Sequence, residues 1–187
     1  MQHPHKETII AQTKKWITDV VVGCNFCPFA AKEIKRGSIF YDIPADASLQ
    51  AVLQATALLL QQMDNEPDIE TALLILPNGF ESFDDYLELV ELAEALVEKE
   101  DYEGIYQVAS FHPLYLFAGS SQDDPSNYTN RSPYPMLHFL REESVSKAVD
   151  SYPGIDEVPE RNIHFTQQKG LKYMQQLLAA CMSNETN

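Results

Sequence analysis

Apolar residues along this chain occur either at helical spacing or in short dense runs. Where they recur every three or four positions, they fall on one face of a helix. Where they form a short run bounded by Gly, Pro or polar residues, they are typical of a buried strand. The pattern predicts long helices over residues 7–22, 49–63 and 83–97, and strands over 38–43, 73–76 and 105–111.

The predicted order is strand, helix, strand, helix, strand, which favours right-handed crossovers between parallel neighbours. Apolar runs at Leu114–Ala118 and Met136–Leu140 predict additional edge strands. Further helices are expected over 28–35, 142–152 and 159–181, the last one split at Gly170. The expected fold is an α/β single-domain sandwich over residues 1–187. Its small mixed sheet of about three to five strands has a β-α-β-α-β core and carries N- and C-terminal helices.

Charge narrows the classes of partner. The chain has 28 Asp and Glu against 13 Lys and Arg, a formal net charge of −15. Binding to nucleic acid or to an anionic membrane requires clustered Lys and Arg, so neither is expected as a partner. No apolar run approaches the roughly 20 residues that span a bilayer, and the N-terminus has no signal-peptide core. With only three cysteines, these features predict a cytoplasmic protein.

The most unusual segment is the polar stretch over residues 123–135, which contains three prolines. Loops of this length inside a domain are usually functional or disordered, and Tyr128 and Tyr134 give this one apolar anchors. Three of the four arginines, Arg131, Arg141 and Arg161, fall in or near it. Guanidinium groups bind carboxylate or phosphate, so an anion site is one interpretation. The alternative is three salt bridges to the many acids.

Cysteine and histidine supply the candidate chemistry. Cys24 and Cys27 have dithiol spacing, but they follow a helix rather than a strand, which argues against a thioredoxin-like motif. Pro28 at a first helical position would place Cys27 at an N-cap, where the helix dipole favours the thiolate. His112 and His138 are the candidate acid/base groups. The alternatives are an inert buried cysteine and histidines that serve as structural hydrogen-bonding groups.

Several motifs together resemble an uncharacterised bacterial family catalogued as domain of unknown function 1415. They are Gly23-x-Asn25-x-Cys27-Pro28-Phe29-Ala30, Phe111-His112-Pro113, the stretch from Asp124 to Pro135, Leu137-His138-x-Leu140-Arg141-Glu142 and Pro159-Glu160-Arg161-Asn162. The resemblance covers nearly the whole chain and implies a bacterial, cytosolic, single-domain protein. It supplies no activity, cofactor or substrate. The family pattern has an apolar residue at the position of Cys24, which favours Cys27 as the functional cysteine.

The leading hypothesis is a site for an anionic small molecule, built from the 123–141 loop, His112 and the Cys27 turn. Arg131 and Arg141 would hold the anion. Cys27 would be the nucleophile or a thiolate ligand, with His112 or His138 as acid/base. One alternative is a protein-docking loop without catalysis. Another is a metal site using Cys27 with either histidine, although no ligand spacing supports it. The predicted ligand-binding residues are Asn25, Asn127, Tyr128, Asn130, Arg131, Ser132, Tyr134, Arg141 and Arg161.

Overall fold

Segments from three parts of the chain form one unit of the computed structural model, and the segments between them form a second. The structure describes residues 5–183 of the 187. Each unit is therefore discontinuous in sequence. Unit 1 contains Met1–Ala31, His112–Pro133 and Gly154–Asn187, and unit 2 contains Lys32–Phe111 and Tyr134–Pro153.

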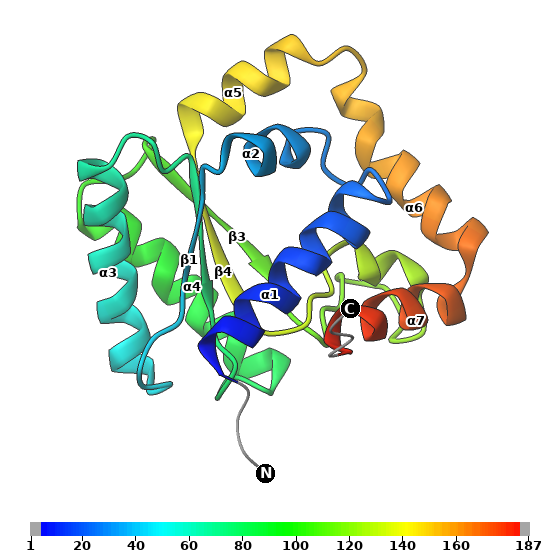
Figure 1. Cartoon of the computed structure of the whole chain (residues 1–187), viewed down its shortest axis with the longest axis horizontal. Helices are drawn as coiled ribbons and strands as arrows, with labels where there is room; N and C mark the ends of the chain where they lie inside the picture. Colours follow the sequence, from blue (N-terminus) through cyan, green and yellow to red (C-terminus); the bar gives the residue numbers. More distant parts are fainter. Residues whose placement is uncertain (1–4, 184–187) are drawn as a thin grey trace. The chain divides into compact units, whose positions relative to one another are not determined.

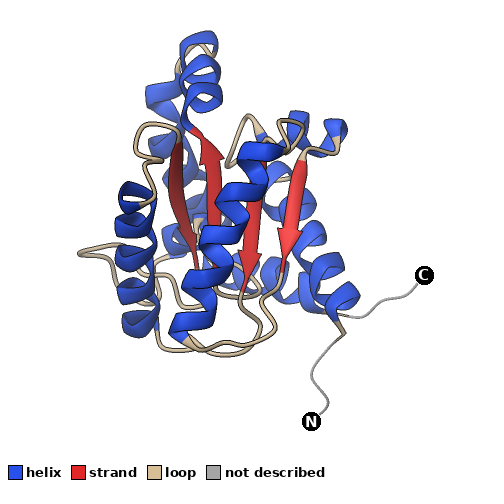
Figure 2. Ribbon diagram, turned by 90° about the vertical axis from the view of Figure 1, so that its left-hand side faces the viewer, coloured by secondary structure: helices blue, strands red, loops and turns tan. Residues whose placement is uncertain are grey.

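Unit 2 is built on a four-stranded sheet with the order β1-β2-β4-β3 (Figures 1 and 2). β1 (Ile39–Asp42) is parallel to β2 (Thr71–Ile75). β4 (Met136–Arg141) is antiparallel to β2 and also to β3 (Tyr106–Phe111). The mixed sheet with alternating strands and helices confirms the predicted α/β class.

Two helices of equal length cover one face of this sheet (Figure 1). α3 (Leu49–Asn65) and α4 (Phe83–Lys99) both begin at a serine, because the Ser48 and Ser82 side chains accept backbone N–H groups of the first turn. Burying each large aliphatic side chain contributes about 1.5–3 kcal/mol. The fully buried core residues include Val52, Leu60, Met63, Ala72, Leu74, Tyr86, Leu89, Ala93, Leu137 and Phe139.

Unit 1 is helical. α6 packs against η2, and α7 packs against α1, η1 and α6. Gly170 separates α6 from α7 with a φ of +81°, as the sequence predicts. The bounds are α1 (Lys6–Trp16), η1 (Ile17–Val22, a π-helix), η2 (Pro125–Thr129), η3 (Ile155–Glu157), α6 (Val158–Lys169) and α7 (Leu171–Met182); α2 (Ala30–Arg36) crosses the boundary between the units, and α5 (Glu142–Ser151) belongs to unit 2.

Three local predictions are wrong. Met136–Arg141 is a central strand, because it inserts between β2 and β3. Leu114–Ala118 forms no strand; the Tyr115 N–H donates to the His112 carbonyl in a turn. α2 begins at Ala30, so Cys27 precedes the N-cap position and lies outside the helix. The argument for a thiolate stabilised by a helix dipole therefore loses its basis.

The first helix ends in a π-helical segment that leads into the Cys27 turn. The Gly23 N–H donates to the Thr18 carbonyl at 3.0 Å, and the Phe26 N–H donates to the Val21 carbonyl at 2.8 Å. These bonds reach back five residues, which is the π-helical spacing. A Cβ at Gly23 would lie 2.2 Å from the Asp19 carbonyl oxygen, so this turn requires glycine.

Replacing Gly23 with alanine should lower the free energy of unfolding by roughly 2 kcal/mol, because the Asp19 backbone must move. Gly104→Ala is the control, since its Cβ meets nothing within 4 Å and only its φ of +75° is unfavourable. The control substitution should lower the free energy of unfolding by about 1 kcal/mol. Urea denaturation measures both, and a Gly23→Ala protein as stable as Gly104→Ala would contradict the close-approach argument.

Candidate functional site

One part of the candidate site is the loop over residues 112–131, which is organised around the fully buried Asn127. Its Oδ1 accepts from the Phe117 N–H at 3.0 Å and from Ser120 Oγ at 2.8 Å, and its Nδ2 donates to the Ser121 carbonyl at 2.8 Å. Through these contacts Asn127 satisfies polar groups of the loop itself, which is a structural role.

His112 begins this loop and is 1% exposed. Its Nδ1 accepts the Leu114 N–H at 3.0 Å, and its backbone N–H donates to the Asn130 carbonyl at 3.3 Å. Because Nδ1 is an acceptor, the neutral ring carries its proton on Nε2. His112 is therefore placed as a hydrogen-bond donor through Nε2, while its basic nitrogen is already engaged.

Arg131 lies at the end of the loop, against the ring of Tyr128 at 4.7 Å. Its Nε donates to the Tyr115 carbonyl at 3.1 Å and its Nη2 to the Gln122 carbonyl at 3.0 Å. Tyr128 is buried, as is Ser132, and Asn130 is half-buried. A docking loop would need exposed tyrosines, so the burial of Tyr128 does not favour that alternative.

The Cys27 turn is fastened to α6 by two side chains. Arg161 Nη2 donates to the Asn25 carbonyl at 2.6 Å, and Asn162 Nδ2 donates to the Phe26 carbonyl at 2.9 Å. Asn25 has a φ of +56°, a conformation that asparagine tolerates better than most residues. Since α6 also packs against η2, one helix supports both the turn and the loop.

The three cysteines are all free thiols, but their environments differ. Burial raises the pKa of the Cys24 thiol, which Lys169 partly offsets, and raises the pKa of Cys181 to about 11. Cys27 is only half-buried. Of the three, Cys27 is the thiol that a small reagent or ligand can reach.

Three predicted site residues belong to unit 2. Tyr134 is buried, which raises the pKa of its hydroxyl. Burial lowers the pKa of His138 to about 4. Arg141 donates to the Ile69 carbonyl at 3.0 Å, to the Tyr106 hydroxyl at 3.1 Å and to the Met63 carbonyl.

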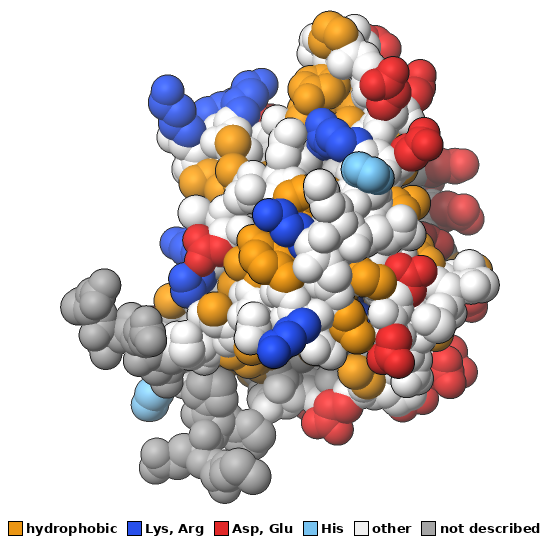
Figure 3. Space-filling model, turned by 90° about the vertical axis from the view of Figure 1, so that its right-hand side faces the viewer, with side chains coloured by type: hydrophobic (Ala, Val, Ile, Leu, Met, Phe, Trp, Pro, Cys, Tyr) orange, Lys and Arg blue, Asp and Glu red, His pale blue; other side chains and the backbone are white. Residues whose placement is uncertain are grey.

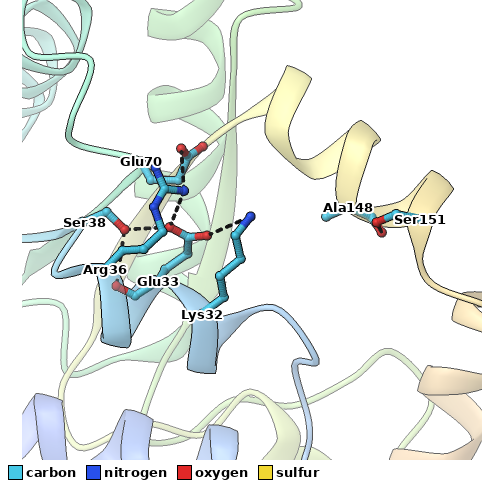
Figure 4. Close-up of polar contacts among 7 residues, drawn as sticks. All are labelled: Lys32, Glu33, Arg36, Ser38, Glu70, Ala148 and Ser151. Atoms are coloured by element: carbon cyan, nitrogen blue, oxygen red, sulfur yellow. Dashed lines mark hydrogen bonds and ion pairs between the residues drawn. The ribbon is translucent and has the colours of Figure 1, made fainter.

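None of the three arginines forms a salt bridge with a carboxylate in the part of the chain that the structure describes. They donate instead to main-chain carbonyls, to one hydroxyl and to one side-chain amide oxygen. Arg36 behaves differently. Its Nη1 lies 3.3 Å from Glu33 and 3.7 Å from Glu70 (Figure 4). The alternative that Arg131, Arg141 and Arg161 form three salt bridges is therefore wrong among these residues.

Charge is divided unequally between the units. Unit 1 contains seven Lys or Arg and eight Asp or Glu, whereas unit 2 contains six against twenty. Almost all of the net charge of −15 therefore belongs to unit 2. Figure 3 shows one face of the molecule, on which acidic side chains are most frequent along the right-hand side. Arg131 and Arg161 lie in the nearly neutral unit, where repulsion of an anion is weakest.

The four-stranded mixed sheet with its alternating strands and helices defines an α/β protein. The chain belongs to the family described as protein of unknown function (DUF1415), whose model matches residues 8–176. This membership confirms the resemblance seen in the motifs. No match was found among curated proteins or among solved structures.

Two features are absent from residues 5–183. These residues contain no group of three or more His, Cys, Asp or Glu side chains placed to hold a metal ion. No helix among them has the length and apolar character needed to cross a bilayer.

Sequence reasoning missed two residues that position the candidate site. Asn162 is buried and holds the Phe26 carbonyl, and Trp16 donates from Nε1 to the Arg131 carbonyl at 3.1 Å. Asn162 was visible only as part of the Pro159–Asn162 motif. Trp16 could be predicted only as an apolar position on the first helix, because the acceptor of its indole N–H lies 115 residues away in the sequence.

Proposed function

We propose that the protein binds a small anionic molecule in unit 1, beside the Cys27 turn, with Arg161 and Arg131 as the cationic contacts. The observation that carries this proposal is the pair of arginines without a carboxylate partner in a chain where acids outnumber bases by 28 to 13. A guanidinium group satisfied only by carbonyls keeps its full positive charge available to a ligand.

The supporting geometry is local to unit 1. Arg161 lies on α6, and Arg131 follows η2, the element against which α6 packs. Cys27 lies two residues beyond Asn25, whose carbonyl accepts from Arg161. Cys27 is the candidate nucleophile toward the anionic ligand, since it is the accessible thiol. Because His138 and Arg141 belong to unit 2 and have structural partners there, the proposal does not depend on them.

Ligand-dependent stability tests the anion site. Inorganic phosphate, sulfate and citrate are compared with chloride at equal ionic strength, and the Tm of the protein is measured. A ligand at 100 times its Kd should stabilise by about 2.7 kcal/mol. Arg161→Gln and Arg131→Gln should lose this stabilisation. Arg36→Gln is the matched control because Arg36 already pairs with carboxylates.

Alkylation of Cys27 by iodoacetamide provides a second readout. Native protein should be modified at Cys27 first, because Cys24 and Cys181 are buried. The stabilising anion should slow this reaction in wild-type protein and leave its rate unchanged in Arg161→Gln. If every anion stabilises Arg161→Gln as much as wild-type protein, or if none stabilises either, the proposed site is wrong.

A further inference from the structure

Acidic side chains crowd the outer face of α4 and the turn that follows it. From Glu81 to Glu103 the chain has ten Asp or Glu and a single lysine, Lys99. All ten acids are exposed. They account for half of the twenty acids in unit 2.

These acids are neighbours on one helix face. Asp84, Glu88 and Glu91 follow one another at spacings of four and three residues, and Glu94 and Glu98 continue the row. Like charges at these spacings repel each other and weaken a helix. Among residues 5–183, no Lys or Arg forms an ion pair with any of them. The row is therefore unneutralised within the described chain.

Two large apolar residues lie in or beside this row. Leu87 is 40% exposed and Leu92 is 41% exposed, whereas Leu89 of the same helix is fully buried. At 100° per residue, Leu87 falls within the row, between Glu94 and Glu98 around the helix axis, and Leu92 falls at its edge, beside Glu88. The outer face of α4 thus combines an acidic stripe with two exposed apolar side chains.

We propose that the outer face of α4 is a docking surface for a basic amphipathic segment of another protein. Lys and Arg side chains of the partner pair with the acidic stripe, and its apolar side chains cover Leu87 and Leu92. Charge complementarity supports this partner, because unit 2 has twenty acids against six bases and attracts cations over a long range. This surface is formed by residues of unit 2, and the proposal does not depend on the anion site in unit 1.

The apolar residues decide between a protein segment and simpler cations. A polyamine or a diffuse ion atmosphere would neutralise the acids without contacting Leu87 or Leu92. A second copy of this chain would bring an equally acidic α4 face against the first, and the like charges would oppose it. A basic helix with an apolar side matches both features of the face.

The probe is a labelled synthetic peptide of Leu and Lys that forms a basic amphipathic helix. Its Kd is measured by fluorescence anisotropy at low and at physiological ionic strength. The triple variant Glu88→Gln, Glu91→Gln, Glu94→Gln should weaken binding at least ~10-fold. The matched control, Asp64→Asn, Glu66→Gln, Asp68→Asn, makes the same change in net charge at exposed positions of unit 2 and should change the Kd less than about 3-fold.

The leucines are tested separately. The double variant Leu87→Ser, Leu92→Ser should raise the Kd of the peptide about 10-fold at both ionic strengths, because apolar contacts are not screened by salt. Circular dichroism confirms that each variant is folded. The proposal is overturned if the control triple weakens binding as much as the α4 triple, or if the leucine variant binds normally. Equal competition by spermine, or a dimer that the leucine variant abolishes, would also overturn it.

Discussion

Replacing Arg141 with methionine should lower the free energy of unfolding by about 3–4 kcal/mol. The guanidinium group of Arg141 joins three parts of unit 2. Nη2 donates to the Met63 carbonyl in the last turn of α3, and Nε donates to the Ile69 carbonyl just before β2. Nη1 donates to the Tyr106 hydroxyl, and the group lies over the Tyr106 ring at 5.4 Å.

The cost is large because the acceptors cannot all reach water. Methionine retains the apolar stem of arginine but leaves two main-chain carbonyls without their donor. One of them is among the last carbonyls of α3, which have no partner within the helix. Arg141→Lys should lose less, since an ammonium group can still reach one acceptor but lacks the planar fork of donors.

Urea denaturation followed by circular dichroism measures these losses. The control is Lys147→Met on α5, which removes an exposed ion pair to Glu143 and should cost less than about 1 kcal/mol. Trp16, the single tryptophan, lies in unit 1, so its fluorescence reports separately on that unit. If Arg141→Met is as stable as Lys147→Met, the three hydrogen bonds contribute nothing and the structural role of Arg141 is refuted.

The sequence predicts the individual helices and strands of this fold better than it predicts which strands pair with one another. The apolar run at Met136–Arg141 predicted a strand, but its place between β2 and β3 follows from pairing with residues about 30 to 70 positions away. The full burial of Met136, Leu137 and Phe139 fits a central strand. The start of a helix could be predicted where a serine caps it, as at Ser82. The predicted helix start at Cys27 was wrong, because Pro28 and Phe29 form a turn before the helix begins.

The candidate site shows the same division. The sequence identified the arginines as unusual, because few bases occur among many acids. Which partners Arg131 and Arg161 take depends on Tyr115, Gln122 and Asn25, and no local pattern indicates these pairs. The unequal net charge of the two units could not be predicted from the sequence either. Unit 1 consists of three separate segments, so its near neutrality can be calculated only once the residues of each unit are known.

His138 lies on the sheet face opposite α3 and α4 and takes part in a defined hydrogen-bonding chain. The Thr71 hydroxyl donates to the Phe139 carbonyl at 2.8 Å and also contacts His138 Nε2. A hydroxyl has one proton, so Nε2–H of the neutral imidazole must donate to Thr71. Burial lowers the pKa of His138 to about 4, so the ring is neutral near pH 7. This arrangement supports a structural role, since an efficient general base has a pKa near the working pH.

The stability of the protein should therefore depend on His138 between pH 7 and pH 4. The ordinary pKa of 6.5 applies to the unfolded chain, and the pKa of about 4 applies to the folded protein. Between these values the unfolded state binds one more proton, so stability falls as the pH falls through this window. At about 1.4 kcal/mol per pKa unit, the total loss approaches about 3 kcal/mol. The contribution is complete above pH 6.5 and has no further slope below pH 4.

The measurement is the free energy of unfolding of wild-type protein and of His138→Gln from pH 7 to pH 4. Carboxylates titrate in both proteins, so the difference between the two curves isolates the imidazole. We expect the stability of wild-type protein relative to the variant to decrease by about 3 kcal/mol across this range. His164→Gln, which removes an exposed histidine on α6, is the control and should follow the wild-type curve. Parallel curves for wild-type protein and His138→Gln would show that burial of His138 does not oppose its protonation.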